Sequence, residues 1–373
     1  MNIAFDARPL VGAWTGVGYW LAGLLAELAA RTDWHFVLAV PRPVRDLGLA
    51  DLAGRTTILA PPTRLPGTLW LQTLAGPAIE GRAQVYVGTL GILPRRLRVP
   101  SALAVHDLTP LSRPRHHTLA NRFCFSAYFA ESLDQANLLV CASDATRARL
   151  TAFDRRHGDR ARVVPLAADR FFCPPPVGDE PEPARRRFAG ARPFIVQLGT
   201  IEPRKGIATL LAAHGRLLTA DPSAPDLVLA GGQGWGGGWL AQALATHPLR
   251  ERVHLPGYVS REEARALLRH AEAVVLASEE EGFGLPLAEA LACGAPCVIS
   301  DEAALLEVAG DSARVFRKGD AAGLEAALIR TLAADRARSR EHSLARASNL
   351  SWDGPASAWE NLLSALAREG NGQ

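Results

Sequence analysis

The 373-residue chain has few cysteines, few lysines and no long apolar run, and each shortage excludes a class of protein. Its five cysteines include no CxxC pair, which argues against a disulfide framework and a cysteine-rich zinc site. No apolar run reaches the roughly 18 residues that a membrane-spanning helix needs. Residues 1–6 show neither the basic nor the apolar region of a secretory signal. We therefore expect a protein of the reducing cytosol.

Familiar catalytic motifs are missing as well. The sequence contains no GxSxG, Walker A or HExxH motif, and no DxD carboxylate pair at the end of a predicted strand. The last absence predicts that basic side chains and helix dipoles, rather than a metal ion, neutralise any bound phosphate. Lysine is rare, since Lys205 and Lys318 are the only two among 41 basic residues. A lysine within a motif is therefore informative.

Short apolar runs alternate with helical patterns, which is typical of parallel α/β sheets covered on both faces. A proline-rich, acidic segment at residues 169–190 indicates a linker. We predict two doubly wound, Rossmann-like domains, at residues 1–168 and 191–352. Ligands of such sheets bind beyond the carboxyl ends of the strands, so two facing domains would hold a ligand in an interdomain cleft. The predicted strands are residues 3–5, 35–40, 57–59, 85–87, 102–105, 138–141 and 163–164, then 194–198, 227–230, 253–255, 273–276, 296–299 and 313–316.

The strongest motif is EGFGLPLAE at residues 281–289, which follows a predicted strand and leads into a helix. Gly282 and Gly284 let the backbone approach a ligand closely, and free N–H groups at the helix start can hold an anion. Glu281 and Glu289 would then each meet a hydroxyl-bearing part of the ligand. The alternative is a solvated acidic loop, and the combination of glycines, proline and a second glutamate argues against it.

A second motif, GTIEPRKG at residues 199–206, lies directly between a predicted strand and a helix. Arg204 and Lys205 thus follow the carboxyl end of a strand and lie beside a helix N-terminus. A guanidinium fork, an ammonium group and a helix dipole together suit a diphosphate. An ordinary surface turn is the alternative, and this position disfavours it.

Three weaker signals lie elsewhere. Gly16 and Gly18 belong to a TGVG loop after the first strand, which would close against a phosphate or sugar, although such loops often contain glycine. His106 ends an apolar strand, where a histidine either binds a substrate hydroxyl or phosphate or is structural. Residues 232–237, GQGWGG, satisfy GxGxxG formally, but no acidic residue follows the next strand. We therefore reject dinucleotide binding and expect a flexible loop there.

Together these motifs resemble the retaining, nucleotide-sugar-dependent glycosyltransferases of family 4, which have the GT-B fold. The resemblance covers nearly the whole chain. Its most specific mark is the Glu-x7-Glu spacing of Glu281 and Glu289. The turn at residues 199–206, the TGVG loop and the strand end at His106 are similar to further motifs of the family. Residues 353–373 look like its C-terminal helix, which returns to the first domain.

This resemblance implies a role for each motif. Arg204 and Lys205 would hold the donor diphosphate, and Glu289 would accept hydrogen bonds from the ribose. Glu281 would hold the transferred sugar, and His106 would touch that sugar near the reacting centre. The other donor-binding residues would be Gly282, Phe283, Gly284 and Leu285, with Gly16 and Gly18 from the TGVG loop. The donor phosphate would take the acceptor proton on the face of departure, which gives net retention.

The resemblance also shapes the expected donor. Many members that use this turn carry asparagine where Gly206 stands, so a side-chain contact from that position is absent here. The EPRK sequence of the turn is frequent among mannosyl- and rhamnosyltransferases. We therefore expect a GDP-sugar co-substrate, GDP-mannose first and a UDP-sugar second, with no cofactor and no metal. The implied role is a hexosyltransferase of bacterial polysaccharide biosynthesis.

Other classes of function stay open from the sequence alone. The same architecture serves sugar-nucleotide epimerases and phosphorylases, and a non-catalytic sugar-nucleotide-binding protein is a third possibility. A phosphorylase would need a lysine for pyridoxal phosphate, and only Lys205 and Lys318 are present. Loss of Glu281 or of the phosphate-binding cations would favour a sensor, and none of them is lost.

The charge of the first domain bears on the acceptor. Residues 1–165 carry 19 arginines against 12 acidic residues, a net charge of +7, whereas the remainder carries −4. The basic runs and candidate exposed apolar residues are Arg95, Arg96 and Arg98, then Arg113, Arg115, His116, His117 and Arg122, with Leu69, Trp70 and Leu71. Such a face attracts anionic lipid headgroups, by about 1 kcal/mol per basic residue.

That face would suit a lipid-linked or other glycan acceptor. The alternative is a solvated, arginine-rich face that reflects codon bias. Nucleic-acid binding is disfavoured because no recognised module accompanies the charge. We expect a cytoplasmic enzyme that works peripherally at the inner face of the cell membrane.

Overall fold

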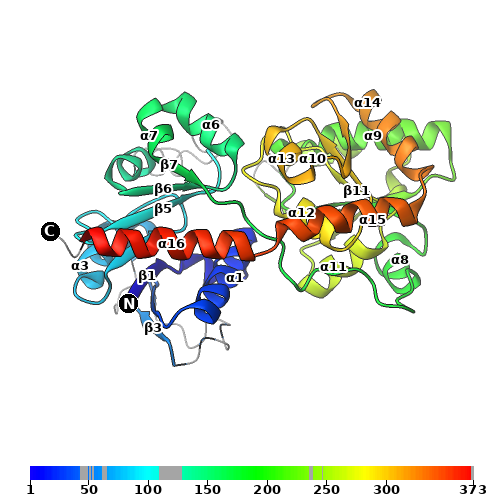
Figure 1. Cartoon of the computed structure of the whole chain (residues 1–373). Helices are drawn as coiled ribbons and strands as arrows, with labels where there is room; N and C mark the ends of the chain where they lie inside the picture. The colour runs from blue at the N-terminus through cyan, green and yellow to red at the C-terminus, as the bar shows by residue number, and fades with distance from the viewer. Residues whose placement is uncertain are drawn as a thin grey trace. The chain divides into compact units, whose positions relative to one another are not determined.

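The computed structural model describes residues 1–42, 49, 52, 54–60, 65–108, 128–234, 238–245 and 247–370. The chain divides into two compact units, Met1–Ala167 with Trp352–Gln373 and Ala168–Ser351. Each unit contains one parallel sheet covered by helices, and every predicted strand is present (Figure 1). The predicted fold class, two doubly wound α/β sheets, is confirmed.

The first unit is built on a seven-stranded parallel sheet in the order β3-β2-β1-β4-β5-β6-β7. Its strands are β1 (Asn2–Asp6), β2 (His35–Ala39), β3 (Thr56–Leu59), β4 (Val85–Gly88), β5 (Ser101–Val105), β6 (Leu138–Cys141) and β7 (Ala161–Val163). The central strands β1, β4 and β5 are buried along nearly their whole length, as continuous apolar runs between two helical layers require.

Helices cover both faces of this sheet. They are η1 (Arg8–Leu10), α1 (Gly16–Arg31), α2 (Gly67–Trp70), the π-helical turn η3 (Leu71–Ala75), α3 (Gly76–Ile79), α6 (Asp144–Phe153), α7 (Arg155–Arg160) and α16 (Asp353–Gly370). Residues 128–135 are helical as well, which agrees with the end of the helix predicted over residues 119–135. The earlier part of that helix lies outside the described residues.

The last helix of the chain, α16, belongs to the first unit, where it packs against α1 and β4 (Figure 1). The buried Trp359 ring of α16 has its centroid 6.0 Å from that of Trp20 on α1. Just before α16, the Trp352 ring lies only 2.6 Å from where a Cβ on Gly23 would be. Glycine at that position is what lets the chain cross α1 so closely.

The second unit has a six-stranded parallel sheet in the order β10-β9-β8-β11-β12-β13. Its strands are β8 (Phe194–Leu198), β9 (Asp226–Ala230), β10 (Val253–Gly257), β11 (Ala273–Leu276), β12 (Cys297–Ser300) and β13 (Ala313–Phe316). Its helices are α8 (Glu182–Ala189), η5 (Pro203–Lys205), α9 (Ile207–Ala220), α10 (Gly238–Ala245), η6 (Arg250–Arg252), α11 (Arg261–His270), α12 (Leu285–Ala292), α13 (Ala303–Ala309), α14 (Ala321–Leu332), α15 (Arg336–Ala347) and η7 (Ser348–Leu350).

The segment predicted as a linker contains helix α8 and lies within the second unit. A proline stands in the first turn of α8, where the missing N–H costs nothing, and Gly190 ends the helix in the left-handed conformation. The helix packs against α11 and β9. The proline residues that indicate a linker therefore also mark a helix start.

The sheet order decides which loops meet. Parallel strands bring all their carboxyl ends to one edge of the sheet. Because β8 and β11 are neighbours, the segments after them, residues 199–206 and 277–284, leave the sheet side by side. In the first sheet β1, β4 and β5 are neighbours, which gathers the residues that follow those strands.

Candidate active site

Two of the predicted motifs meet at the carboxyl edge of the second sheet. Arg204 and Lys205 lie in η5 after β8, and Glu281 lies in the loop between β11 and α12. Lys205 Nζ is 2.6 Å from Glu281 Oε1, and Arg204 Nη1 is 3.4 Å from Glu281 Oε2. The sequence motifs at residues 199–206 and 281–289 thus contribute to one cluster.

Further hydrogen bonds fix the Glu281 carboxylate and join the two loops. Ser278 donates from Oγ to Glu281 Oε1 at 2.8 Å, and Ser300 donates to the Ser278 carbonyl at 2.6 Å. Arg204 donates from Nη1 to the Glu280 carbonyl at 3.2 Å. These donors hold the carboxylate in one orientation without depending on a ligand.

The electrostatics of the cluster keep Glu281 ionised. Glu281 is 6% exposed, and burial by itself raises a carboxyl pKa. Lys205, Arg204 and the Ser278 hydroxyl outweigh that effect, so the pKa of Glu281 lies below its ordinary value. Glu202 also pairs with Arg204, at 2.6 Å, which gives the cluster two carboxylates and two cations. Its formal charge is balanced before any ligand enters.

The geometry at Gly206 explains why this chain has glycine where many similar sequences have asparagine. It adopts a left-handed φ of 65° and forms the N-cap of α9. A Cβ at this position would lie 1.9 Å from the Ala277 carbonyl oxygen. The turn that bears Arg204 and Lys205 therefore packs directly on the end of β11, which leaves no room for a side chain.

The start of α12 has the geometry that its sequence predicts. Gly284 adopts φ 100° as the N-cap, and a proline occupies the first turn. A Cβ on Gly284 would meet Leu305 at 2.6 Å, so the glycine also permits close packing. Gly282 and Phe283 precede it in the buried part of the loop, and Leu285 is the first residue of the helix.

Glu289 lies on α12, half-buried, and the structure does not bring it into contact with the cluster. The groups that act on it electrostatically are Arg261, at the start of α11, and Asp169. Burial raises the pKa of Glu289 to about 8, with Arg261 opposing the rise and Asp169 adding to it. This carboxyl group is therefore largely protonated at neutral pH.

The first unit positions His106 at the carboxyl end of β5. Its Nε2 donates to the Thr89 carbonyl at 3.1 Å, and the Thr89 hydroxyl donates to the Asp6 carbonyl at 2.7 Å. Trp20 meets the imidazole edge-on at 4.6 Å. Burial lowers the pKa of His106 to about 4, so the ring is neutral at pH 7. With Nε2 donating, Nδ1 is left as a hydrogen-bond acceptor.

Gly16 and Gly18 lie within a helix, whereas the sequence predicts that the TGVG segment is a loop. Helix α1 begins at Gly16, with Thr15 as its N-cap and a hydrogen bond from Tyr19 N to the Thr15 carbonyl at 3.0 Å. A Cβ on Gly18 would lie 2.7 Å from the Pro9 carbonyl. Close packing of η1 on α1 thus explains this glycine.

The described part of the GQGWGG segment, residues 232–234, is hydrogen-bonded to the turn after β8. Gly232 and Gly234 each form a backbone hydrogen bond with Ile201, at 2.9 and 3.0 Å. Gln233 and Ile201 form a parallel bridge. Its first residues are therefore tied to the turn after β8 rather than free, and residues 235–237 lie outside the described residues.

Sequence reasoning missed two features of these edges. Ser278 donates a hydrogen bond to Glu281. The only indication of this in the sequence was a serine three residues before the motif. In the first unit, Arg8 forms a two-pronged pair with the buried Asp6 at the end of β1, with Nη2 2.6 Å from Oδ2. The sequence could have indicated this ion pair, because two charged residues of opposite sign follow closely on a buried apolar strand.

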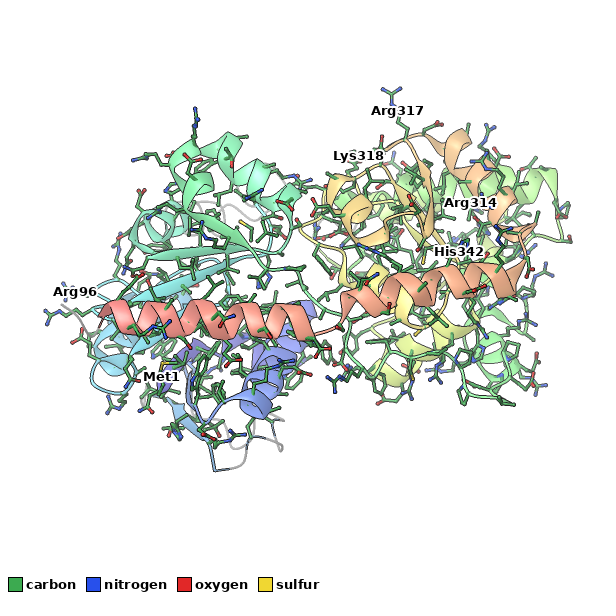
Figure 2. All side chains as sticks on the ribbon, viewed as in Figure 1. Met1, Arg96, Arg314, Arg317, Lys318 and His342 are labelled. Atoms are coloured by element: carbon green, nitrogen blue, oxygen red, sulfur yellow. The ribbon has the colours of Figure 1, made fainter. Side chains whose placement is uncertain are left out.

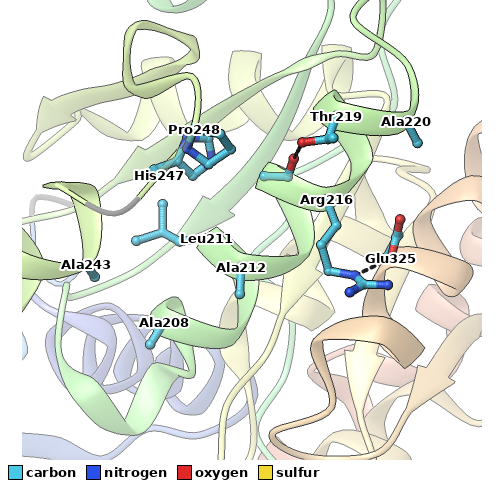
Figure 3. Close-up of a pocket in the computed structure, with 11 residues that line it drawn as sticks. Ala208, Leu211, Ala212, Arg216, Thr219, Ala220, Ala243, His247, Pro248 and Glu325 are labelled. Carbon is cyan, nitrogen blue, oxygen red and sulfur yellow. Dashed lines mark hydrogen bonds and ion pairs between the residues drawn. The ribbon is translucent and has the colours of Figure 1, made fainter.

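A hollow of about 600 Å³ lies away from this cluster, between α9 and residues 247–248. Figure 3 shows Ala208, Leu211 and Ala212 along α9, with Arg216 paired to Glu325 of α14. None of the predicted site residues lines this hollow. Its apolar wall carries no chemistry of its own.

The described residues offer neither a grouped set of metal ligands nor a helix suited to a membrane. Among those residues, no three His, Cys, Asp or Glu side chains are grouped so that they could hold a metal ion. In the same part of the chain, no helix has both the length and the apolar character needed to cross a membrane.

Comparison with known proteins gives consistent results. Residues 179–348 match the family described as "Glycosyl transferases group 1". The chain is 28% identical over 371 residues to the O-antigen chain mannosyltransferase B of Escherichia coli, over 95% of this chain and 97% of that relative. It is 30% identical over 227 residues to the serotype-specific mannosyltransferase WbdA of Escherichia coli, over 58% of this chain and 28% of that longer relative.

Solved structures resemble the fold over nearly the whole chain. Sucrose-phosphate synthase from Thermosynechococcus elongatus has a TM-score of 0.75 at 21% identity, covering 98% of this chain and 99% of that one. WaaG, a glycosyltransferase involved in lipopolysaccharide biosynthesis, has a TM-score of 0.72 at 14% identity, covering 96% and 98%. Residues 179–348 thus match the group 1 glycosyltransferases, and the whole chain has the two-sheet GT-B fold of the solved structures that it resembles.

Proposed function

We propose that this retaining glycosyltransferase transfers mannose from GDP-mannose to a glycan acceptor that is carried on a lipid. The similarity to an O-antigen chain mannosyltransferase over nearly the whole of both chains supports mannose as the sugar. The EPRK turn, frequent among mannosyl- and rhamnosyltransferases, points the same way. A UDP-sugar is the second candidate donor.

The observation that carries the proposal is the contact of Glu281 with both Lys205 and Arg204. Arg204 and Lys205 bind the donor diphosphate, because a guanidinium fork and an ammonium group together match its oxygens. Glu281, held ionised and oriented by Ser278, accepts hydrogen bonds from hydroxyl groups of the sugar. The donor phosphate then adds negative charge beside Arg204 and Lys205, which pair with Glu202 and Glu281 in the unliganded cluster.

Glu289 would bind the ribose hydroxyls. Hydroxyl donors favour the ionised form of a carboxyl group. Because Glu289 has a pKa of about 8 in the unliganded protein, the donor would displace its proton on binding. The backbone of Gly282, Phe283, Gly284 and Leu285 would support the sugar, and Gly16 and Gly18 stay predicted donor contacts.

The transfer step needs no protein base in this proposal. The acceptor hydroxyl oxygen forms a bond to the anomeric carbon while the bond from that carbon to the diphosphate oxygen breaks. The acceptor proton passes to the departing phosphate on the same face, so the anomeric configuration is retained. His106, neutral and with its Nε2 engaged by Thr89, accepts a hydroxyl hydrogen bond through Nδ1. Its low pKa makes it a poor proton acceptor.

The alternative functions find less support. A phosphorylase would attach pyridoxal phosphate to a lysine amine. Lys205 is 2.6 Å from Glu281, and Lys318 is 2.9 Å from Glu302. Both amines are thus engaged by buried carboxylates, which disfavours attack on an aldehyde. An epimerase or a non-catalytic binding protein would not transfer the sugar to an added acceptor, so a transfer assay distinguishes both from a glycosyltransferase.

The basic face of the first unit is less cationic than its sequence indicates. Arg95 pairs with Glu131 at 2.7 Å, and Arg98 lies 3.8 Å from Glu80. Arg96, with a positive φ of 57°, forms no ion pair among the described residues and projects from the ribbon (Figure 2). The second basic run, Arg113, Arg115, His116, His117 and Arg122, lies outside the described residues.

The apolar part of that face needs correction. Trp70 and Leu71 were expected to be exposed, but both are fully buried under the first sheet, and Leu69 alone is exposed, at 46%. Trp70 ends α2 and Leu71 begins the π-helical turn η3, which directs both side chains into the core. Peripheral binding at the inner membrane face therefore rests on the arginines.

A donor panel tests the proposed function. Thermal unfolding would be followed with GDP-, UDP-, ADP- and dTDP-sugars, since a ligand at 100 times its Kd stabilises by about 2.7 kcal/mol. We expect GDP-mannose to give the largest shift, and the shift to be lost in Lys205→Gln. Turnover that needs an added acceptor supports a transferase, whereas conversion of the sugar nucleotide without one indicates an epimerase. A selective response to a UDP-sugar would contradict GDP-mannose.

Vesicle sedimentation tests the membrane proposal. Binding should rise with anionic lipid and fall with salt, and it should drop when Arg95, Arg96 and Arg98 become glutamine. Arg314→Gln, on β13 of the second unit, is a matched control (Figure 2). Equal recovery in the supernatant with neutral and anionic vesicles would indicate a soluble acceptor.

A further inference from the structure

A second charged pocket lies in the second unit, at the edge opposite the Glu281 cluster. It has a volume of about 450 Å³ and is enclosed by α8, the end of α11, α15 and the proline-rich turn after residue 174. Helices α8 and α11 run into the amino ends of β8 and β11, whereas Lys205 and Glu281 follow the carboxyl ends. A strand of five residues separates the two edges by roughly 16 Å.

Two carboxylates in the pocket each bridge two nitrogen-bearing side chains, three arginines and one histidine in all. Glu272 accepts from Arg185, at 2.9 Å, and from Arg336. Asp179 lies 3.0 Å from Arg269 and 3.3 Å from His270. These two acids are the only carboxylates among the residues that line the pocket, as far as the structure describes them.

A fourth arginine adds positive charge that the two acids do not neutralise. Arg340 also lines the pocket and forms no ion pair with any residue that the structure describes. Four arginines thus face two carboxylates, an excess of two positive charges even with His270 neutral. The Arg340 stem lies over Gly294, where a Cβ would be 2.8 Å from its Cγ. This contact fixes the stem while leaving the guanidinium without an acidic partner.

One donor in the pocket is also unsatisfied. Arg185 Nε is buried and has no hydrogen-bond partner among the described residues, although its Nη2 binds Glu272. An unsatisfied buried donor costs about 1–3 kcal/mol, and more when it is charged. An oxyanion that entered the pocket would balance the excess charge and accept hydrogen bonds from the guanidinium N–H groups that face it. Planar guanidinium groups match such an anion in a two-pronged geometry.

We propose that this pocket binds a small phosphate-type oxyanion, with Arg340 as its principal ligand and Arg185 as a second. The site is separate from the one that would hold the donor diphosphate and does not depend on the proposed function. Its volume falls within the range of small-molecule sites. The ligand is a free phosphate or diphosphate rather than a headgroup in a membrane, because the guanidinium groups line a pocket of about 450 Å³ rather than a flat face.

Calorimetric titration of the full chain with inorganic phosphate tests this proposal. We expect Arg340→Gln to weaken phosphate binding roughly tenfold or more, and Arg340→Lys to weaken it less because the charge remains. Arg338→Gln, an exposed position on the same helix outside the pocket, is the matched control and should bind like the unsubstituted protein. Thermal unfolding without phosphate verifies that each variant is folded.

Two further arms separate this pocket from other phosphate sites. Arg204→Gln should leave phosphate binding at the new pocket intact, so a loss that follows Arg204 instead of Arg340 would overturn the proposal. Absence of binding at millimolar phosphate, or equal binding by Arg340→Gln, would overturn it too. Binding to phosphatidate vesicles that depends on Arg340, without any binding of free phosphate, would reject the soluble ligand in favour of a headgroup.

Discussion

Lys205 Nζ lies 2.6 Å from Glu281 Oε1, which joins the turn after β8 to the loop after β11. Both side chains are mostly buried, at 12% and 8% side-chain exposure. The cation proposed for the donor phosphate and the carboxylate proposed for the donor sugar therefore neutralise one another in the unliganded protein. Substitution of either residue alters the environment of the other, which shapes the first two predictions.

Replacement of Glu281 by glutamine should reduce transfer by about a hundredfold or more, because the sugar loses a charged acceptor that is oriented in advance. Binding of the nucleoside diphosphate should be unchanged or tighter, since Lys205 and Arg204 lose a competing anion. Steady-state kinetics and GDP titration measure the two effects separately. Glu279→Gln, two residues away, is the control, and full activity of Glu281→Gln would contradict the assigned role.

Replacement of Arg204 or Lys205 by glutamine should weaken nucleotide binding, in contrast to replacement of Glu281. The affinity for the nucleoside diphosphate should fall by about 1.5–3 kcal/mol for each charge-assisted hydrogen bond lost. Calorimetric titration with GDP and UDP measures this loss, and Arg216→Gln on α9 is a suitable control because Arg216 pairs with Glu325 away from the cluster. If Arg204→Gln bound nucleotide like the unsubstituted protein, the diphosphate assignment would be wrong.

Glu289 should make stability depend on pH. Its pKa is about 8 in the folded chain, above the ordinary value of about 4.3. A raised carboxyl pKa stabilises the fold most at low pH, and that contribution falls between about pH 4 and pH 8. The free energy of unfolding, relative to Glu289→Gln, should therefore decrease over this range and then level off. Urea denaturation measures it, with the exposed Glu341→Gln as control, and a constant difference across the range would reject the raised pKa.

Gly206 should tolerate no side chain. Alanine there would meet the Ala277 carbonyl at 1.9 Å and would have to keep a positive φ. We expect Gly206→Ala to lower the free energy of unfolding by about 2–4 kcal/mol. Gly232→Ala is the matched control, since a Cβ there meets nothing within 4 Å. Equal denaturation midpoints for the two variants would show that the turn can move away from β11.

Transfer should be independent of added metal. The sequence offers no DxD pair, and Arg204 and Lys205 supply positive charge at the proposed diphosphate site. Activity measured after dialysis against EDTA should stay close to the untreated value. A strict requirement for Mg²⁺ or Mn²⁺ would show that the diphosphate charge is neutralised in another way.

Apolar runs and turn residues were sufficient to predict the strands and the start of α12. They predict these features because burial between helical layers and helix-start chemistry are local properties of the sequence. The meeting of Arg204, Lys205 and Glu281 depends on β8 and β11 being neighbours, a pairing that no local pattern specifies. The exposure of Trp70 was wrongly predicted because a π-helical turn changes which side chains face the core.

Other parts of the site depend on contacts between distant residues. The sequence indicates Gly206 as a permissive turn residue, whereas its close approach to Ala277 emerges only in three dimensions. The role of Ser278 follows from its hydrogen bond to Glu281. A serine in a predicted loop does not by itself indicate such a contact. The low pKa of His106 likewise depends on burial against other elements of the first unit, among them the Trp20 ring, whereas the hydrogen bond to Thr89 opposes it.

The return of α16 to the first unit sets an order on folding during synthesis. Residues 168–351 form a continuous unit, so they can fold as soon as they leave the ribosome. The first unit, although made earlier, lacks Trp352 and Trp359 until the whole second unit has been made. Until then Trp20 and the groove at Gly23 have no cover. Premature termination near residue 350 would therefore yield an intact C-terminal unit attached to an N-terminal unit with exposed apolar surface, a target for chaperones and proteases.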